Sequence, residues 1–313
     1  DHLVIYPNSQ QRKHAVNGFG VLENLNIPGL IIDEKSNQVD VMGLQATLYL
    51  NGQECDIREI QMLRPRDIEK IEYHDAPSGK YAKDKLVVNF ITKQYRYGGY
   101  VQADGLQTIG YDHGDYNVAT NYVKGNNSYT VFAGANYSHV DGTETWNNEN
   151  YQFPQSLFDR ESYSRNSYRN HQEYMQFRYQ NQKGKRYWVG KFTLVNLSTP
   201  RNASSGFARE SIETDVFSNI RKKSLSPKID LNANLPLSKN QTLTLGVHGK
   251  YSANSYHRLY QEQPFEAMTD EDEKVLSFQL SAIYNYFSQK HSLSVELFHY
   301  HDVWNADYSG NCE

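Results

Sequence analysis

The stretch that decides the N-terminal fold runs from Ala46 to Lys93 and reads ATLYLNGQECDIREIQMLRPRDIEKIEYHDAPSGKYAKDKLVVNFITK. Its residues 47–50 predict a strand, and the dipeptide Asn51-Gly52 that closes it is typical of a tight turn. A short helix is predicted over 56–62, and a second helical segment over 67–72 after Pro65. The apolar run 86–92 predicts a buried strand. Together with strand signals at 30–32, 39–41 and 47–50, this pattern predicts a small α/β domain over residues 1–95.

From residue 96 onward the sequence alternates between polar and apolar residues. Ile229, Leu231, Ala233 and Leu235 are separated by polar residues, and the same period recurs in 243–247, 278–286 and 293–297. A period of two places each apolar set on one face of a strand. Further strands are expected near 97–109, 115–123, 128–140, 171–181 and 185–198. Residues 96–313 therefore predict about nine antiparallel strands with one apolar face each.

The connections between these strands are predicted to be of two kinds. Short turns are expected at 124–127, 182–185, 238–240 and 288–290, and long polar loops at 141–170, 199–225 and 254–273. Transmembrane β-barrels have short turns at one end, long loops at the other and aromatic girdles at the lipid interfaces. A soluble β-sandwich explains the alternation equally well, but it explains the loop asymmetry less well and gives no reason for the aromatic residues beside the short turns. These aromatic residues are Tyr122, Tyr129, Tyr179, Tyr187, Trp188, Tyr286 and Phe287.

Composition excludes several classes of protein. The 313 residues include 32 Lys and Arg and 36 Asp and Glu, a formal net charge of −4 that gives no support for nucleic-acid binding. No apolar run approaches the roughly 18 residues that a membrane helix needs. Two cysteines, Cys55 and Cys312, are too few for a disulfide scaffold. The 25 tyrosines are the unusual feature, and most of them lie in the alternating region.

Both ends of the sequence suggest a segment of a longer protein. The chain opens at Asp1-His2-Leu3 without a basic and then apolar leader, and it ends at 309–313 directly after a strand-like run. We therefore expect the barrel strands to be incomplete in this chain.

Four pieces of the Ala46–Lys93 stretch carry a family resemblance. They are Leu48-Tyr49-Leu50-Asn51-Gly52, Ile68-Glu69-Lys70-Ile71-Glu72, Ala76-Pro77-Ser78-Gly79-Lys80-Tyr81 and Val87-Val88-Asn89-Phe90-Ile91-Thr92-Lys93. In this order they resemble the plug domain of TonB-dependent outer-membrane receptors, in the form found in Bacteroidetes outer-membrane β-barrel proteins. Upstream, residues 22–29 are similar to the family's leucine and proline-glycine element.

The resemblance implies a fold and a function. It implies a plug domain over 1–95, followed over 96–313 by part of a transmembrane barrel that has 22 strands in such transporters. Ile68, Ile71, Val88 and Phe90 would supply the plug core. The implied protein lies in the outer membrane of a Gram-negative bacterium, captures a small ligand and imports it with energy from a TonB-type coupling protein. It implies no enzymatic activity and no cofactor, and it leaves siderophore, cobalamin, glycan and peptide open as ligands.

The sequence departs from the family pattern in three places. Glycines are common just before the valine-asparagine strand, where this chain has Asp84-Lys85-Leu86. The short energy-coupling segment near the N-terminus and the aromatic C-terminal residue are not recognisable. These departures leave the predicted fold intact, and they leave the coupling to a TonB-type protein open.

Two sets of candidate site residues follow. The resemblance assigns structural motif positions to Pro28, Gly29, Asn51, Gly52, Ile71, Glu72, Pro77, Ser78, Tyr81, Asn89, Thr92 and Lys93. The predicted loop 141–170 is a candidate for ligand capture, because aromatic rings stack on sugars and heterocycles and Arg pairs with carboxylates or phosphates. Its candidate residues are Trp146, Tyr151, Arg165, Tyr168 and Arg169. The other interpretation of this segment is a Tyr-rich loop that packs on its neighbours.

Other patterns are too weak to name a site. His299 and His301 share one strand face, but two ligands without a third do not predict a metal site. The acidic run 270–273 is more typical of a solvated loop than of a Ca²⁺ site. No phosphate-binding loop, zinc spacing or nucleophile motif is present, so no catalytic or metal-ligating residue is predicted.

Two alternatives to the receptor remain open from the sequence. The first is a soluble or surface-attached β-rich binding or adhesion protein without transport. The second is an outer-membrane barrel with a plug that anchors a partner and transports nothing. Dependence on detergent separates the first from the receptor, and uptake assays separate the second.

Overall fold

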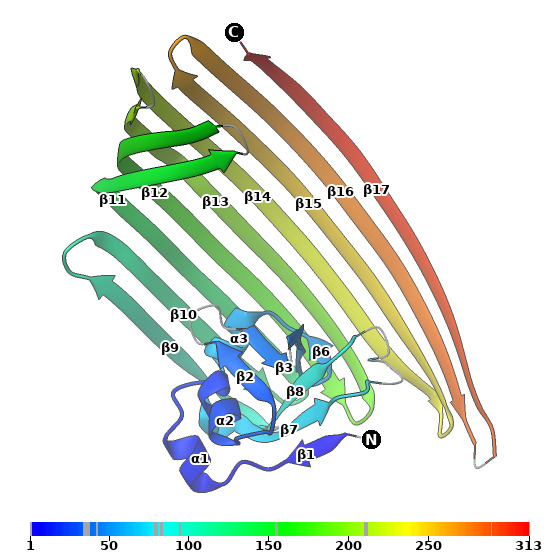
Figure 1. Ribbon diagram of the computed structural model, residues 1–313. Helices are drawn as coiled ribbons and strands as arrows, with labels where there is room; N and C mark the ends of the chain where they lie inside the picture. The colour runs from blue at the N-terminus through cyan, green and yellow to red at the C-terminus, as the bar shows by residue number, and fades with distance from the viewer. Residues whose placement is uncertain are drawn as a thin grey trace. The chain divides into compact units, whose positions relative to one another are not determined.

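The computed structural model describes residues 2–33, 38–41, 43–77, 81, 84–93, 95–153, 156–209, 212–288 and 290–312. The chain forms two compact units, Asp1–Arg96 and Tyr97–Glu313. Figure 1 shows the first as a small unit of short helices and strands and the second as one sheet of long strands. Each unit has its own internal packing, so they are described separately.

The N-terminal unit combines short helices with two small sheets. Its helices are α1 (Ser9–Lys13), α2 (Gly18–Asn24), α3 (Ile57–Gln61) and the 3₁₀ turn η1 (Pro65–Asp67). A five-stranded sheet has the order β1-β7-β8-β5-β6, with β1 (Leu3–Ile5), β7 (Ile68–His74), β8 (Val87–Thr92), β5 (Thr47–Leu50) and β6 (Gln53–Glu54). A three-stranded sheet joins β2 (Leu30–Asp33), β3 (Gln38–Val41) and β4 (Leu44–Gln45). Only β5 and β8 pair in parallel among the described strands.

The helix predicted over 56–62 is confirmed as α3, and its start is explained by a capping box. The side chain of Asp56 accepts a hydrogen bond from the backbone N–H of Arg58, and the Glu59 carboxylate accepts one from the N–H of Asp56. These bonds satisfy amide groups that have no partner within the first turn of a helix. Ile60 then turns into the core, where it is fully buried.

The core of the unit lies between the five-stranded sheet and the helices. The predicted core residues Ile68, Ile71, Val88 and Phe90 are all fully buried, and they pack in one cluster with Leu22 and Ile60 among others. Full burial of a large apolar side chain stabilises a fold by about 1.5–3 kcal/mol. β8 provides two of the four predicted residues, so this strand is the centre of the unit in packing as well as in sheet order.

The prediction of a helix over 67–72 is wrong, because this segment enters strand β7. Ile68 and Ile71 are three residues apart, which is a helical spacing. The ladder between β7 and β8 is irregular between Ile68 and Lys70, where an extra residue opposes the partner strand. This β-bulge lets both isoleucines face the core from a strand.

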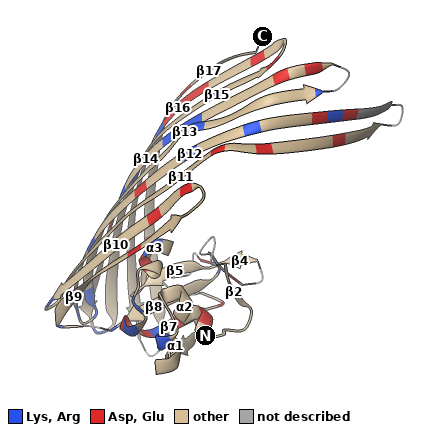
Figure 2. Cartoon of the chain, turned by 90° about the vertical axis from the view of Figure 1, so that its left-hand side faces the viewer, with Lys and Arg blue, Asp and Glu red and all other residues tan. Residues whose placement is uncertain are grey.

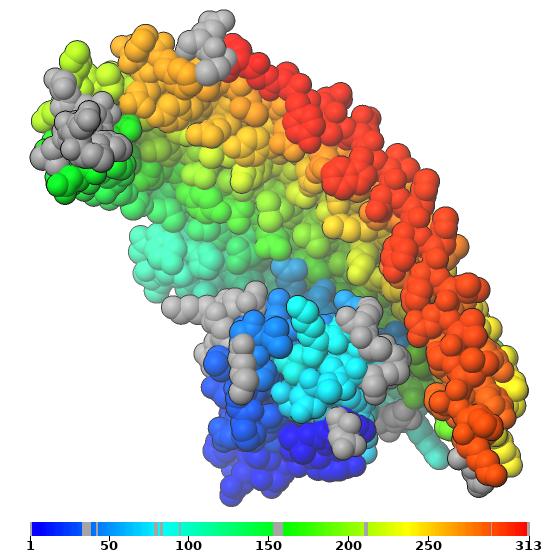
Figure 3. All heavy atoms as spheres, turned by 45° about the vertical axis from the view of Figure 1, so that its right-hand side comes forward, coloured from blue at the N-terminus to red at the C-terminus, as the bar shows by residue number. Residues whose placement is uncertain are grey.

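The C-terminal unit is a single antiparallel sheet of nine strands. Its order β9 to β17 follows the chain, and each strand pairs with its sequence neighbours (Figure 1). The antiparallel sheet predicted after residue 96 is therefore confirmed. The strands are β9 (Tyr97–Thr108), β10 (Asp112–Lys124), β11 (Asn127–Phe153), β12 (Ser156–Lys183), β13 (Arg186–Arg209), β14 (Glu213–Ser238), β15 (Gln241–Glu262), β16 (Phe265–Phe287) and β17 (Ser292–Cys312). Figure 3 shows β17, in red, along one edge of this sheet with β16 beside it.

The predicted short turns at 124–127, 182–185 and 238–240 are confirmed by the strand bounds, and the fourth, at 288–290, includes Gln289, which lies outside the described residues. Two of them begin with Gly125 and Gly184, each with a φ of +60°. Two-residue hairpin turns of type II′ need a positive φ at their first central residue, which glycine adopts without strain. The register across the first turn is regular up to the pair Lys124 and Asn127.

Among the described residues, the predicted long loops are not present as loops; residues 154–155 and 210–211 lie outside that description. Residues 141–170, 199–225 and 254–273 lie almost entirely in strands, and they continue the ladders of β11 to β16. The polar sequence of these segments is compatible with strands because their backbone groups pair with each other whatever the side chains are. The acidic run 270–273 likewise lies in β16 and not at the end of a loop.

Candidate functional site

The two faces of the nine-stranded sheet carry different side chains at the same level along the strands. Cross-strand partners share a face, so the register defines rows of residues across the sheet. One row consists of Phe177, Phe192, Ile229, Gly249 and Phe278. The adjacent row, on the opposite face, consists of Arg178, Lys191, Asp230, His248 and Gln279. We call these the apolar face and the polar face.

Burial on this sheet is inverted relative to that of a water-soluble protein. In β12, Met175 and Phe177 of the apolar face are 45% and 41% exposed. Their neighbours Gln176 and Arg178 on the polar face are only 0% and 5% exposed. A soluble sheet buries its apolar side chains and leaves polar ones in water. A large apolar surface of this sheet is therefore exposed.

The buried carboxylate Asp230 is surrounded by basic groups on the polar face. Its Oδ1 lies 2.8 Å from Nδ1 of His248, and its Oδ2 lies 3.3 Å from Nζ of Lys228 and 3.9 Å from Nζ of Lys191. These residues are next to the apolar row that contains Ile229. Charged groups at this level need partners or water, because an isolated charge is costly in an apolar medium.

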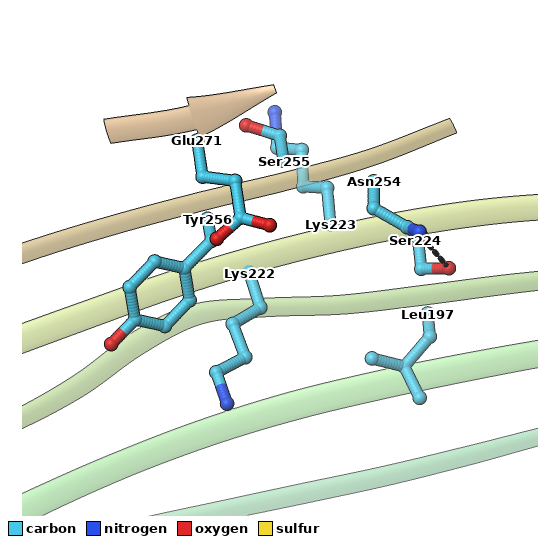
Figure 4. A pocket seen from close by; sticks show the side chains of 8 residues that line it. All are labelled: Leu197, Lys222, Lys223, Ser224, Asn254, Ser255, Tyr256 and Glu271. Carbon is cyan, nitrogen blue, oxygen red and sulfur yellow. Dashed lines mark hydrogen bonds between the residues drawn. The ribbon is translucent and has the colours of Figure 1, made fainter. Parts of the chain in front are cut away.

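A hollow of about 310 Å³ lies further along the polar face, in strands β13 to β16 (Figure 4). Its lining residues on the polar face are Leu197, Lys222, Ser224, Asn254, Tyr256 and Glu271. Lys223 and Ser255 also border it, although the register assigns them to the opposite face. The register places Lys222, Tyr256 and Glu271 in one row of cross-strand partners, with Tyr256 in the middle. The hollow therefore combines a cation, a carboxylate and an aromatic ring on one face.

The contacts in this hollow fix some of its groups and leave others available. The ammonium group of Lys222 lies 5.4 Å from the centre of the Tyr256 ring. The Ser224 hydroxyl donates to Oδ1 of Asn254 at 2.7 Å, and the Asn254 amide donates to Glu273 at 3.0 Å. Figure 4 shows the first of these bonds on the side of the hollow opposite Tyr256. This arrangement can bind a polar ligand, and it contains no pair of groups set up for proton transfer or nucleophilic attack.

An aromatic row lies on the apolar face near the short turns. Tyr97, Tyr122, Tyr129 and Tyr179 follow each other across β9 to β12, with ring centres 6.3, 6.4 and 5.2 Å apart. Of the other predicted aromatic residues, the register places Trp188 and Tyr286 on the same face, but Tyr187 and Phe287 on the polar face. The predicted aromatic cluster is thus mainly, but not wholly, a feature of one face.

The five candidate residues of the predicted capture loop lie in strands β11 and β12. Figure 2 shows charged residues along the far ends of these strands. The register places Trp146, Arg165 and Arg169 on the continuation of the apolar face, and Tyr151 and Tyr168 on the other. These side chains are therefore divided between two surfaces.

The ring contacts of this region form a small aromatic group. The Trp146 ring centre lies 4.6 Å from that of Tyr163 and 6.0 Å from that of Phe207. Arg169 makes an ion pair with Asp141 at 3.6 Å. The rings pack on their cross-strand partners, which explains part of the aromatic content of this segment.

Several motif residues of the N-terminal unit form one hydrogen-bond network. The Asn51 amide donates to Oγ1 of Thr92 at 2.9 Å, and Oδ1 of Asn51 accepts from the backbone N–H of Thr92 at 2.9 Å. The buried Asn89 accepts from the backbone N–H of Gly52 at 2.9 Å and donates to Glu72 at 2.9 Å. The network therefore holds the Asn51-Gly52 turn against β8.

Glu72 joins this network to a cation. Lys70 Nζ lies 2.7 Å from Oε1 of Glu72. Burial of the Glu72 carboxyl opposes its ionisation, but hydrogen bonds from Lys70 and Asn89 outweigh burial and hold its pKa below the ordinary value. Glu72 is therefore ionised at neutral pH and accepts both bonds.

The remaining motif residues have separate positions. Pro28 and Gly29 form a turn in which the Leu30 N–H donates to the Ile27 carbonyl at 3.1 Å, with a φ of +78° at Gly29. Tyr81 is buried with its ring centre 4.7 Å from that of Tyr49. Ile71 lies in the core, Pro77 is half-buried, Lys93 is exposed, and Ser78 is outside the described residues.

The residues of the hollow were not predicted from the sequence, although a signal for them is present. Lys222 and Ser224, Asn254 and Tyr256, and Glu271 and Glu273 are each two residues apart, so each pair shares a strand face. These pairs lie in the segments predicted to be polar loops, and a spacing of two indicates a shared face only within a strand. The three pairs come together on one face only through the pairing register of the strands, and this register cannot be predicted from the sequence.

The described part of the chain holds neither a cluster of metal ligands nor a helix that could span a membrane. Within this part, no group of three or more His, Cys, Asp or Glu side chains is arranged to hold a metal ion. His299 and His301 lie in β17 at positions of the apolar face. No helix among the described residues has the length and hydropathy required to cross a membrane.

Comparisons with known proteins give structural matches only. No family model and no curated protein sequence matches the chain. The ferric yersiniabactin uptake receptor FyuA from Yersinia pestis aligns at 12% identity over 99% of this chain and 61% of that chain, with a TM-score of 0.36. The pyoverdine-bound FpvA of P. aeruginosa aligns at 11% identity over 100% of this chain and 53% of that chain, with a TM-score of 0.41. The ferric-catecholate import receptor Fiu from E. coli K12 aligns at 10% identity over 99% and 67%, with a TM-score of 0.34. The chain thus spans between half and about two thirds of the length of these three proteins.

Proposed function

We propose that this chain is the plug domain and part of the β-barrel of a TonB-dependent outer-membrane receptor of the Bacteroidetes type. In this proposal residues 1–95 are the plug, and residues 96–313 are strands of a barrel that has 22 strands when complete. The protein captures a small ligand at the cell surface and imports it, without enzymatic chemistry or a cofactor. The observation that carries the proposal is the inverted burial of the nine-stranded sheet.

The apolar face has the dimensions of a lipid-facing band. In β16, Leu276, Phe278, Leu280, Ala282 and Tyr284 occupy successive positions of this face. Eight residues at about 3.3 Å each span about 26 Å, or about 20 Å across a membrane for strands tilted by about 40°. The apolar band of outer-membrane barrels is about 25 Å tall and is flanked by aromatic girdles. The tyrosines from Tyr97 to Tyr179 add aromatic rings to this face close to the short turns, which supports the proposal.

The polar face supports an aqueous or protein-filled interior. Arg178, Lys191 and Asp230 lie at the same level as the apolar band and are buried or nearly so. Lumen-facing positions in transmembrane barrels are polar and alternate with lipid-facing ones. Such charges could not face lipid, whereas they are stable beside water or a plug.

The soluble alternative would need a cover for the apolar face. Monomeric soluble proteins rarely expose a continuous apolar patch of more than a few hundred Å². A binding or adhesion protein on a soluble scaffold would therefore associate through this face in water. The anchoring alternative keeps the barrel and differs from the receptor only in transport.

The test of membrane insertion is fractionation of the full-length protein. We expect it in the outer-membrane fraction, extractable only with detergent, and migrating faster on gels before heating than after it, as folded barrels do. A protein that stays monomeric in buffer without detergent would contradict the proposal.

Transport is tested separately from insertion. In cells that express the full-length protein, growth on a limiting nutrient supplied as siderophore, cobalamin, glycan or peptide is compared with and without the TonB-type partner. Growth that depends on both proteins supports the receptor. Growth that is indifferent to either protein for every ligand class supports the anchoring alternative.

A further inference from the structure

We propose that the hollow lined by Lys222, Tyr256 and Glu271 binds a short zwitterionic peptide of about three residues. The inference rests on the proposed function, because it names the ligand class that such a receptor would take up. In the proposed orientation the hollow lies on the lumen face, beyond the apolar band and on the side away from the short turns. A ligand entering the barrel from outside would meet this part of the face first.

The first argument is that two opposite charges face the hollow without neutralising each other. Lys222 and Glu271 are separated by Tyr256 in the same row, which puts their backbones two strands, or about 10 Å, apart. The Lys222 ammonium lies over the Tyr256 ring, and within the described residues no hydrogen bond or ion pair is formed by the Glu271 carboxylate. Figure 4 shows both side chains beside the Tyr256 ring.

The spacing of the two strands that carry these charges sets the length of the ligand. An extended chain advances about 3.3–3.6 Å per residue, so three residues span about 10 Å. The terminal ammonium of such a peptide can pair with Glu271 while its terminal carboxylate pairs with Lys222. The volume of about 310 Å³ agrees with a small ligand, since it lies at the lower end of the range for small-molecule sites.

The neutral groups of the hollow suit a peptide backbone. Because the Ser224 hydroxyl donates to Asn254, its oxygen keeps lone pairs that can accept an N–H from the ligand. Asn254 is itself held by its bond to Glu273, so the pair has a fixed geometry. Leu197 supplies an apolar surface for a small side chain.

Other ligand chemistries would leave one of these groups without a partner. A purely anionic ligand would pair with Lys222 but would face the carboxylates of Glu271 and Glu273. A purely cationic ligand would face Lys222, and a neutral sugar would leave both charges unpaired in a site from which it displaces water. A zwitterion satisfies both charges at once.

The test uses calorimetric titration of the full-length protein in detergent with three probes: trialanine, N-acetyl-trialanine and trialanine amide. We expect trialanine to bind and both blocked peptides to bind at least tenfold more weakly. Lys222→Met should weaken trialanine at least tenfold and leave the amide, which lacks the carboxylate, unchanged. Glu271→Gln should weaken trialanine by a similar factor and leave the acetylated peptide unchanged.

Matched controls come from the opposite face of β16. Asp272→Asn and Lys274→Met each remove one charge from apolar-face positions close to the site in sequence, and they should leave all three titrations unchanged. Equal binding of free and blocked peptides, or no binding of trialanine, would overturn the inference.

The same preparation separates this inference from the proposed function. An outer-membrane protein that does not discriminate the three probes refutes the peptide site and leaves the receptor standing. A protein that remains soluble without detergent refutes the receptor, and the titration on it still decides the site.

Discussion

The turn residue Asn51 has a conformation that few side chains tolerate. Its φ is +52°, and its amide group makes both hydrogen bonds that tie the turn to Thr92. Asparagine adopts the left-handed region more readily than other residues with a Cβ. The dipeptide Asn51-Gly52 is therefore fixed by backbone conformation and by side-chain chemistry together.

Asn51→Ala should destabilise the N-terminal unit by about 1–3 kcal/mol, because it removes the side-chain bonds and strains the turn. Hydrogen exchange of the amides in 47–54 and 87–92 measures this loss in the full-length protein. Asn51→Gly restores the backbone freedom but not the bonds, so it should recover part of the loss. A variant Asn51→Ala with unchanged protection would contradict this account of the turn.

Asp84 stands just before β8, in the segment where the sequence departs from the plug pattern that it resembles, and it forms specific bonds. Its carboxylate accepts hydrogen bonds from the Tyr49 hydroxyl at 2.7 Å and from the Thr47 hydroxyl at 3.1 Å. Both donors lie in β5, so Asp84 fixes the segment before β8 to the parallel neighbour of that strand. The departure from the family pattern thus adds a link within the unit.

Burial and the hydrogen bond to Asp84 raise the pKa of Tyr49 far above its ordinary value of 10.0. The folded protein therefore keeps this proton at a pH where the unfolded chain has lost it. The resulting stability is complete below about pH 10 and falls as the pH rises toward the folded pKa, by about 1.4 kcal/mol per pH unit. Unfolding of the N-terminal unit between pH 9 and 11 measures this slope. The same slope in Tyr49→Phe would exclude Tyr49 as its source.

At the scale of elements, the aromatic row on β9 to β12 is a continuous stack of cross-strand contacts. Tyr129 is its central member, with neighbours on both sides. Aromatic pairs contribute about 0.5–1.5 kcal/mol each beyond the area that they bury. Tyr129→Ala should therefore reduce the free energy of unfolding from lipid bilayers by about 1–3 kcal/mol. Gln102→Ala, at a polar-face position of β9, is the control and should change it by less than about 0.5 kcal/mol.

Strands with a period of two and turns with glycine could be predicted from the sequence, because local chemistry decides them. The strand β7 could not, since Ile68 and Ile71 share a face only through a bulge that depends on pairing with β8. The polar ends of β11 to β16 could not be predicted from the sequence either. Their side chains carry no apolar pattern, and the ladder that makes them strands is formed with distant residues.

Some residues of the candidate sites could likewise be predicted from the sequence, and others could not. The motif residues around Asn51 are contiguous enough in the sequence for a family resemblance to point to them. Lys222, Tyr256 and Glu271 come from three strands, and only the register brings them into one row. Residues that form a site through pairing of strands are hidden until the pairing is known.

At the scale of the whole molecule, a new charge should destabilise the large sheet much more on its apolar face than on its polar face. Leu280→Arg places a cation in the middle of the apolar band, and it should cost about 2–4 kcal/mol of stability in a bilayer. Gln279→Arg puts the same side chain on the polar face next to it, and its cost should be below about 1 kcal/mol. Urea unfolding in lipid vesicles compares the two. A smaller loss for Leu280→Arg than for Gln279→Arg would contradict the lipid-facing assignment.

The order of strands in the large sheet has a consequence for how it is made. Each strand from β10 to β17 pairs with the strand synthesised just before it, through connections of a few residues. The sheet can therefore grow by one strand at a time in the direction of synthesis, and no strand has to search for a distant partner. At every stage the newest strand leaves a row of unpaired amide and carbonyl groups, which can also pair with another chain. Correct assembly then depends on how quickly the next hairpin arrives at that edge.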